Sequence, residues 1–230
     1  FSDDLLSSIG VSGMNPFLID THAHLHFPPY DHDCEDVLRR MRERNIWTVT
    51  IGTALENSRR GIEFAEMHPD VWATVGLHPS HVTSPHFDEQ EGGVEEHDVE
   101  AEVLKKLASS SEKVVAIGEA GLDFYRLDDH PDPEKAKQEQ ERVFRVHLQV
   151  AKELDLPVVI HCRDGLQRLA EIVQEMWNQG WQPRAIVHSF TGTWEEAKPL
   201  IDLNLMIAVN GIATFPLRKG QDPSTAIDRT

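Results

Sequence analysis

The segment IDTHAHLHF, residues 19–27, places His22, His24 and His26 within five positions, directly behind an apolar run and an aspartate. If this segment is a strand, alternate side chains face the same side, so the three imidazoles can converge on one point as a metal site requires. A histidine-rich surface loop explains a lone His-x-His equally well. The remainder of the chain has to separate these two interpretations.

Short apolar runs alternate with helix-like segments along the whole chain. The apolar runs are FLID (17–20), IWTVTIG (46–52), VWATVGLH (71–78), KVVAIGEAGLD (113–123), LPVVIHC (156–162), RAIVHSF (184–190) and LMIAVNG (205–211). The helix candidates span residues 34–45, 56–69, 97–110, 134–154, 165–180 and 193–204. Near-continuous apolar strands separated by helices are typical of a parallel α/β sheet.

Local signals predict where some of these helices begin and end. Asp33 precedes the first helix and is a favourable N-cap residue, and Gly180 is a suitable C-terminal stop for the helix over 165–180. We expect Pro199 to kink or shorten the last helix.

Polar residues follow the apolar part of most predicted strands. They are Asp20, His22, His78, Glu119, His161, His188 and Asn210. In a (β/α)8 barrel the functional groups lie on this carboxyl-terminal face of the strands. A doubly wound open sheet would instead carry a glycine-rich phosphate loop after its first strand, and none is present. The predicted fold class is therefore α/β, a (β/α)8 TIM-type barrel.

The number of predicted strands is one short of a complete barrel. We expect residues 1–16 to form an N-terminal arm, and residues 17–230 to form the barrel with an acidic surface insertion over residues 84–98. Without the arm and the insertion roughly 200 residues remain, whereas a barrel typically takes about 250. We therefore expect the last βα unit to be absent from this chain.

Composition limits the class of protein. No apolar run approaches the roughly 18 residues of a membrane helix, and the two cysteines, Cys34 and Cys162, predict a reducing, cytoplasmic or nuclear setting. The net charge is −17, with eight acidic residues and no lysine or arginine between Asp88 and Glu102. An acidic protein gains little from long-range attraction to phosphates, so a nucleic-acid substrate would need local cations such as bound metal ions.

Five strand-end residues form the candidate metal site. They are His22, His24, Glu119, His161 and His188. Imidazole and carboxylate ligands favour zinc, manganese, iron or nickel over magnesium or calcium. A glutamate between histidine groups can bridge two cations, and a metal pair can activate water and bind the oxygens of a phosphoryl group. A histidine on its own, such as His161 or His188, could instead bond a backbone carbonyl at a strand end.

The ordered motifs resemble the TatD family of metal-dependent deoxyribonucleases. They are DTHAHLHF, GLHP, IGEAGLDFYR, QERVFRVHLQVAKELDLPVVIHCRD, IVHSFTGT and NGIATF, and they extend from Ile19 to Phe215. The resemblance implies an amidohydrolase-type barrel with two divalent metal ions, such as Zn²⁺, Mn²⁺ or Mg²⁺. It also implies that His22 and His24 hold the first ion, that Glu119 bridges, and that His161 and His188 hold the second.

One departure from the family pattern concerns catalysis. The family has an aspartate in a Glu-Thr/Ser-Asp-x-Pro motif on its last strand, placed to orient or deprotonate the nucleophilic water. That motif is absent from the sequence, and neither Asp222 nor Asp228 follows an apolar strand, so no catalytic residue is assigned. The chain is a fragment, or its last unit is supplied by something else, or full activity has been lost.

Four further residues are candidates for substrate binding. His78 in GLHP could hydrogen-bond a phosphate or form a structural turn, and Arg163 could hold two phosphate oxygens with its planar guanidinium. Asp123 and Tyr125 could support metal-bound histidines or cap the end of the strand.

Three other residues of metal-binding type are expected to be structural. Cys162 should point away from His161 into the layer between strands and helices, and His147 should be buried on its helix. His26 is expected to line a loop or pocket.

Together with the candidate metal site, the resemblance implies a metal-dependent phosphodiester hydrolase acting on DNA, as a 3′-to-5′ exodeoxyribonuclease on single strands or 3′ ends. A barrel of this type could also act on an amide, ester or lactone, because fold and ligands do not fix the substrate. A non-catalytic binding protein is the third alternative, motivated by the absent aspartate and the net charge. Nothing in the sequence identifies a protein partner.

Overall fold

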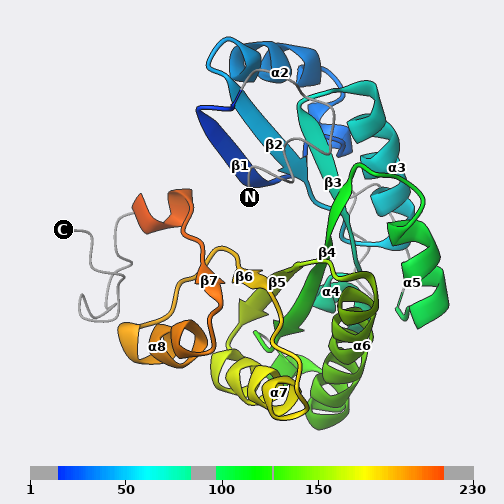
Figure 1. The fold of residues 1–230 in the computed structure, drawn as a ribbon. Coiled ribbons are helices and arrows are strands. Elements are labelled where there is room, and N and C mark those ends of the chain that lie inside the picture. Colours follow the sequence, from blue (N-terminus) through cyan, green and yellow to red (C-terminus); the bar gives the residue numbers. More distant parts are fainter. Residues whose placement is uncertain (1–14, 84–96, 126, 215–230) are drawn as a thin grey trace.

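The strands form one curled parallel sheet with helices along its outer face (Figure 1). The computed structural model describes residues 15–83, 97–125 and 127–214. The strands follow one another in the sheet in the order of the chain, β1-β2-β3-β4-β5-β6-β7, and every neighbouring pair is parallel. The predicted parallel α/β architecture is confirmed.

All seven predicted strands are present. They are β1 (Leu18–Ala23), β2 (Ile46–Thr50), β3 (Val71–Val75), β4 (Val114–Asp123), β5 (Val158–Arg163), β6 (Ala185–Val187) and β7 (Met206–Ile207). The last strand is much shorter than the predicted apolar run over 205–211. Beyond β7 the Ala208 N–H still donates to the Val187 C=O of β6, and a short 3₁₀ segment begins at Gly211.

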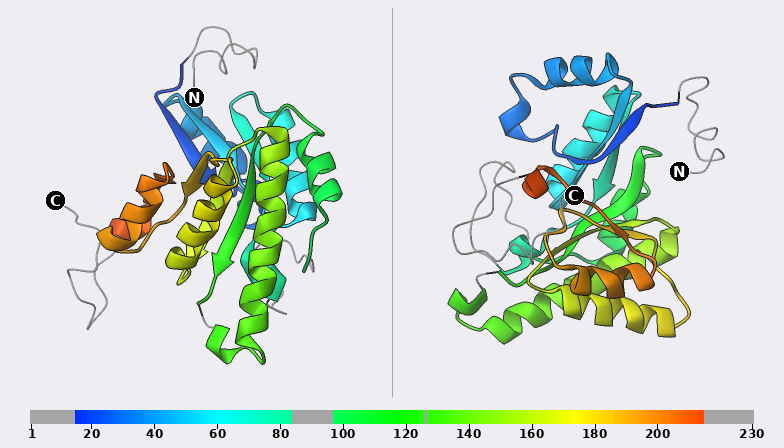
Figure 2. Two further views of the ribbon diagram at one scale, coloured as in Figure 1. Left: turned by 60° about the horizontal axis from the view of Figure 1, so that its bottom comes forward. Right: turned by 90° about the vertical axis from the view of Figure 1, so that its left-hand side faces the viewer.

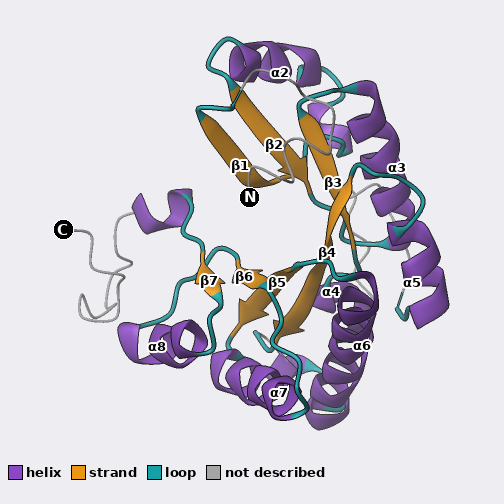
Figure 3. Ribbon diagram, viewed as in Figure 1, coloured by secondary structure: helices purple, strands orange, loops and turns teal. Residues whose placement is uncertain are grey.

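The helices alternate with the strands and cover the convex side of the sheet (Figure 3). The α-helices are α2 (Cys34–Arg42), α3 (Leu55–Met67), α4 (Pro79–Thr83), α5 (Ala101–Ala108), α6 (Pro133–Leu154), α7 (Leu166–Asn178) and α8 (Trp194–Asp202). The 3₁₀ segments are η1 (Pro28–Tyr30), η3 (Leu127–Asp129) and η4 (Gly211–Thr214). The one-turn helix α4 and the 3₁₀ segments were not predicted, because elements this short have no hydrophobic period.

At two helix ends the structure differs from what the sequence predicts. Asp33 occupies the N-cap position of α2, but its side chain makes no capping hydrogen bond. Pro199 does not shorten α8, which continues for three residues beyond it to Asp202. This helix begins with a capping box in which Thr193 Oγ1 accepts from the Glu196 N–H and Glu196 Oε2 accepts from the Thr193 N–H. The prediction for Gly180 is consistent with the structure, because α7 ends at Asn178 and Gly180 has a φ of +83°.

The apolar core has two parts on opposite faces of the sheet. The larger part lies between strands and helices and includes Phe144 and Leu148 of α6. The smaller part includes Trp47 and Trp72, whose ring centroids are 5.1 Å apart. Because residues alternate across a strand, neighbouring residues of β2 and β3 contribute to different faces. Burial on both faces explains why the strands read as continuous apolar runs.

The sheet curls into part of a barrel, with β1 and β7 as its two edges. Both edges carry exposed apolar side chains, with Leu18 of β1 53% and Met206 of β7 64% exposed. Figure 2 shows the same open arrangement from two other directions. Within the described ranges, no helix has the length and apolar character to cross a membrane. The arm over 1–16 and the insertion over 84–98 fall almost entirely outside the described residues.

Candidate metal centre

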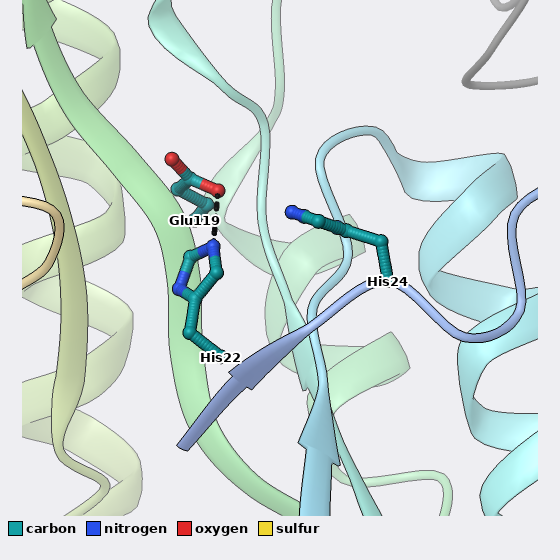
Figure 4. Close-up of side chains that lie close together, drawn as sticks. All are labelled: His22, His24 and Glu119. Carbon is teal, nitrogen blue, oxygen red and sulfur yellow. Dashed lines mark ion pairs between the residues drawn. The ribbon is translucent and has the colours of Figure 1, made fainter. Parts of the chain in front are cut away.

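Histidines from several strands surround one glutamate at the carboxyl ends of the sheet. His22 belongs to β1 and His24 follows it, while Glu119 and His161 belong to β4 and β5. His188 comes directly after β6. In Figure 4 the side chains of His22 and Glu119 point toward each other, and the His24 ring is directed toward this pair. The structure thus brings together side chains that are up to 166 positions apart (His22 to His188).

Glu119 is the centre of this cluster and is only 3% exposed. Its Oε1 lies 2.6 Å from Nε2 of His188, 3.0 Å from Nδ1 of His161 and 3.4 Å from Nε2 of His78. Its Oε2 lies 3.3 Å from Nε2 of His22. One buried carboxylate therefore faces four imidazoles.

These contacts determine the charge on Glu119. Burial by itself would raise the pKa of the carboxyl, but the nearby His78 and hydrogen bonds from His161, His188 and His22 lower it well below its ordinary value. Glu119 is therefore a carboxylate at neutral pH and is able to act as a metal ligand.

Asp123 supports His161 from the other side of its ring. Asp123 Oδ2 lies 3.0 Å from Nε2 of His161, so the ring lies between two carboxylates. Burial lowers the pKa of His161, but hydrogen bonds to Asp123 and Glu119 raise it to about 9. The same ring contact outweighs burial and lowers the pKa of Asp123. A carboxylate that orients a histidine in this way is typical of metal sites.

The donor set fits divalent metal ions. Two groups have ligand atoms that all lie within 4.8 Å of one another, namely His22, His24 and Glu119, and His78, Glu119 and His161. Glu119 belongs to both groups, as expected for a bridging ligand. Nδ1 of His22 is buried and has no hydrogen-bond partner among the described residues, which is costly unless something else satisfies it.

His78 lies closer to this centre than the sequence indicated. It follows β3, and the sequence predicts it to be a substrate-binding residue rather than a ligand. The structure puts it in the second ligand group, while His188 contacts Glu119 without joining either group. The signal for His78 was its position at a strand end in GLHP, which is the same signal that identified His161.

Arg163 and Tyr125 form a separate exposed pair. The Arg163 Cζ lies 3.4 Å from the centre of the Tyr125 ring, a stacked cation–π contact. The Tyr125 N–H donates to Asp123 Oδ1 at 3.1 Å, which connects this pair to the residue that supports His161. Both side chains are therefore placed beside the cluster without lying in it.

The three residues expected to be structural are placed as follows. His147 is fully buried, and Cys162 packs against the larger core, where burial raises the pKa of its thiol to about 12. His26 bonds Thr50 Oγ1 through Nδ1 at 2.7 Å and lines a hollow of about 630 Å³ beside α2 and α3. The residues lining that hollow do not include Glu119 or the imidazoles around it. Asp222 and Asp228 lie outside the described residues.

A curled parallel sheet with imidazoles around a carboxylate at its strand ends defines a barrel-type metal-binding protein. Comparison with known proteins identifies the family. The model of the TatD related DNase family matches residues 19–227, so this chain belongs to that family.

Individual relatives agree with this assignment. The chain is 34% identical to the 3′-5′ ssDNA/RNA exonuclease TatD of Pantoea ananatis, over 84% of this chain and 68% of the relative. It is also 34% identical to the metal-dependent hydrolase YabD of Bacillus subtilis, itself described as uncharacterized, over 86% of this chain and 70% of the relative. The crystal structure of YjjV, a TatD homologue from Escherichia coli K12, superimposes with a TM-score of 0.69 at 30% identity, covering 86% of this chain and 70% of that one.

The sequence-based resemblance and the TIM-type barrel fold are confirmed by these matches. The chain is a metal-dependent hydrolase of the TatD-related family.

Proposed function

We propose that this protein hydrolyses phosphodiester bonds in DNA as a 3′-to-5′ exodeoxyribonuclease that uses two divalent metal ions. The observation that carries the proposal is Glu119, a buried carboxylate with four imidazole nitrogens at 2.6–3.4 Å. The name of the Pantoea relative, a 3′-5′ ssDNA/RNA exonuclease, supports a nucleic-acid substrate over an amide, ester or lactone.

The two ligand groups, His22 with His24 and Glu119, and His78 with Glu119 and His161, support two ion sites that share Glu119, and His188 adds a contact with Glu119 at 2.6 Å. His22 and His24 would hold one ion, His161 and His188 the other, and Glu119 would contact both. His78 is a further candidate ligand of the second ion, because its Nε2 lies 3.4 Å from Glu119 Oε1. Divalent ions in such a site supply activation of water at neutral pH and neutralisation of charge on the phosphodiester.

The chain's own residues would bind and orient the substrate. Arg163 presents a planar guanidinium that suits two phosphate oxygens, and the Tyr125 ring beneath it restricts its orientation. Asp123 would hold the His161 ring in place through its Oδ2. Local binding groups are needed because the whole chain has a net charge of −17.

Degradation of end-labelled single-stranded DNA tests the proposal. With Mn²⁺ or Mg²⁺, a 5′-labelled strand should shorten progressively, whereas a 3′-labelled strand should release its label as a mononucleotide at once. EDTA should stop both reactions. A strand whose 3′ end is blocked with a phosphorothioate linkage should persist.

A substrate panel sets the limits of the proposal. Matched RNA, duplex DNA and simple esters and lactones should be tested beside the labelled DNA. Intact DNA under Mn²⁺, Mg²⁺ and Zn²⁺ would reject the nuclease activity, and turnover of an ester or lactone alone would support the amidohydrolase alternative.

A further inference from the structure

Helix α6 carries two buried polar side chains on a face that is otherwise apolar. Gln140 is 1% exposed and His147 is 0% exposed, whereas their buried neighbours on α6 include Val143, Phe144 and Leu148. His147 lies seven positions after Gln140, which is close to two helical turns, so both face the same side of the helix. Figure 2 shows α6 running beside β4, which it contacts.

Gln140 holds the backbone of Asp123 at the end of β4. Its Oε1 accepts from the Asp123 N–H at 2.8 Å, and its Nε2 donates to the Asp123 C=O at 3.0 Å. The same Nε2 donates to Thr83 Oγ1 of α4 at 3.0 Å. One amide therefore fixes both backbone groups of the residue whose carboxylate contacts His161.

His147 holds the backbone next to His78 in the same manner. Its Nδ1 donates to the Val143 C=O at 2.8 Å, and its Nε2 accepts from the Leu77 N–H at 3.0 Å. The partners determine the tautomer, since a carbonyl can only accept and an amide N–H can only donate. Burial lowers the pKa of His147 to about 4, so the ring stays neutral and keeps this arrangement.

Both side chains thus connect one helix to the residues that support the candidate metal centre. Burying an amide or an imidazole is costly unless it is hydrogen-bonded, and these two are bonded to strand ends rather than only to their own helix. We propose that Gln140 and His147 are positioning residues that fix Asp123 and His78, and through them the imidazoles around Glu119. The inference rests on the proposed metal centre, but it does not depend on the substrate.

Metal binding by the metal-free protein tests this inference directly. Gln140→Met and His147→Leu remove the hydrogen bonds while retaining apolar bulk. Leu148→Ala is the matched control, because Leu148 lies on the same helix, is 0% exposed and makes no polar side-chain contact. Mn²⁺ affinity is measured by calorimetric titration, and the loss of stability in each variant by urea unfolding.

The two variants should bind Mn²⁺ about tenfold more weakly than wild type, the lower end of the effect of groups that support metal ligands. Leu148→Ala should keep wild-type affinity even if it loses as much stability. Amide hydrogen exchange in the metal-free protein should accelerate at Asp123 in Gln140→Met and at Leu77 in His147→Leu.

Conservative variants keep the test available if the apolar ones fail to fold. Gln140→Glu retains the acceptor for the Asp123 N–H but loses the donor, so its Mn²⁺ affinity should be intermediate. His147→Gln can still accept from the Leu77 N–H and should restore most of the affinity.

The inference is overturned if Mn²⁺ affinity falls as much in Leu148→Ala as in Gln140→Met and His147→Leu. It is also overturned if the affinity does not fall in those two variants. Wild-type protein that binds Mn²⁺ but leaves DNA intact would reject the proposed function alone. Wild-type protein that binds no Mn²⁺ would reject both.

Discussion

Glu119 Oε1 lies 2.6 Å from Nε2 of His188, although the strands that carry the two residues are not neighbours. Strand β5 separates β4 from β6, and its own His161 contacts the same oxygen at 3.0 Å. The carboxylate thus connects three consecutive strands at their carboxyl ends. This relationship makes the glutamate the residue on which the whole cluster depends.

Replacing Glu119 by glutamine should abolish metal retention. Gln keeps the shape of the side chain but removes the negative charge that faces four imidazoles. Metal affinity should fall more than about 100-fold, beyond the range for groups that only support a ligand. Elemental analysis after dialysis should therefore find no metal retained by the variant. Glu112→Gln is the control, because Glu112 is exposed just before β4. Equal metal content in both variants would contradict the role of Glu119.

Gly76→Ala should distort the same site through the backbone. A Cβ at Gly76 would lie 2.5 Å from the carbonyl carbon of Gly118 and 2.7 Å from the carbonyl oxygen of Glu119. Because both atoms belong to β4, the strand itself would have to move. We expect a loss of about 1–3 kcal/mol in the free energy of unfolding, as for other overpacked sites, together with weaker Mn²⁺ binding. Urea denaturation measures the first effect. Gly211→Ala, where no atom of the described residues lies within 4 Å of the new Cβ, should leave both properties unchanged.

The order of strands and the residues of the cluster were predictable from sequence, because both follow from local pattern. Apolar runs ending in a histidine or glutamate place that side chain at one end of a parallel sheet, which is sufficient to collect His22, Glu119, His161 and His188. The sequence does not give distances across strands. It therefore could not show that His78 would reach Glu119 while Arg163 would stack on Tyr125.

The interactions that support the cluster were harder still to predict from the sequence. His147 was expected to be buried on its helix, and it is, but its hydrogen bond to Leu77 joins residues 70 positions apart. The sequence does not single out Gln140, because a glutamine in a charged helix is ordinarily at the surface. Only the packing of α6 against the sheet shows that this amide meets the backbone of Asp123.

Metal affinity should rise with pH between about 6.5 and 9. In the metal-free protein the pKa of His161 is raised to about 9, because hydrogen bonds to Asp123 and Glu119 outweigh burial. The ring therefore carries a proton at neutral pH, and a metal ion bound to it must displace that proton. Titration of Mn²⁺ at several pH values should show affinity rising by at most about tenfold per pH unit.

Asp123→Asn should reduce this pH dependence by lowering the pKa of His161. In the metal-free protein the same raised pKa stabilises the fold below pH 6.5, and the contribution is lost as the pH rises through about 9. Mn²⁺ affinity that is constant from pH 6.5 to 9 would show that His161 is not a ligand.

Arg163→Met should impair substrate binding but leave metal content unchanged. The guanidinium stacks on Tyr125 beside the cluster and makes no contact with Glu119 that would affect the ions. Loss of a charge-assisted hydrogen bond should raise KM about tenfold or more with a smaller change in kcat. Arg184→Met is the control, since Arg184 precedes β6 at the opposite end of the strands. A fall in kcat alone would place Arg163 in the chemical step instead.

His26 should make the metal-free protein sensitive to acid. Burial lowers the pKa of His26 to about 3, and the positive charges of His24 and Arg60 add to this shift. The folded state keeps the ring neutral, whereas the unfolded state takes up a proton below pH 6.5. The contribution of His26 to the free energy of unfolding is therefore fully present above pH 6.5. It is lost as the pH falls toward 3, with a slope of about 1.4 kcal/mol per pH unit. The His26→Gln variant should lack this slope, so the stability difference between wild type and variant should change with pH when both are measured by urea unfolding at pH 6.5, 5.5 and 4.5. His32→Gln, which alters an exposed histidine beside the same hollow, should leave the slope in place. Parallel pH profiles for wild type and His26→Gln would mean that His26 is protonated as readily in the folded chain as in the unfolded one.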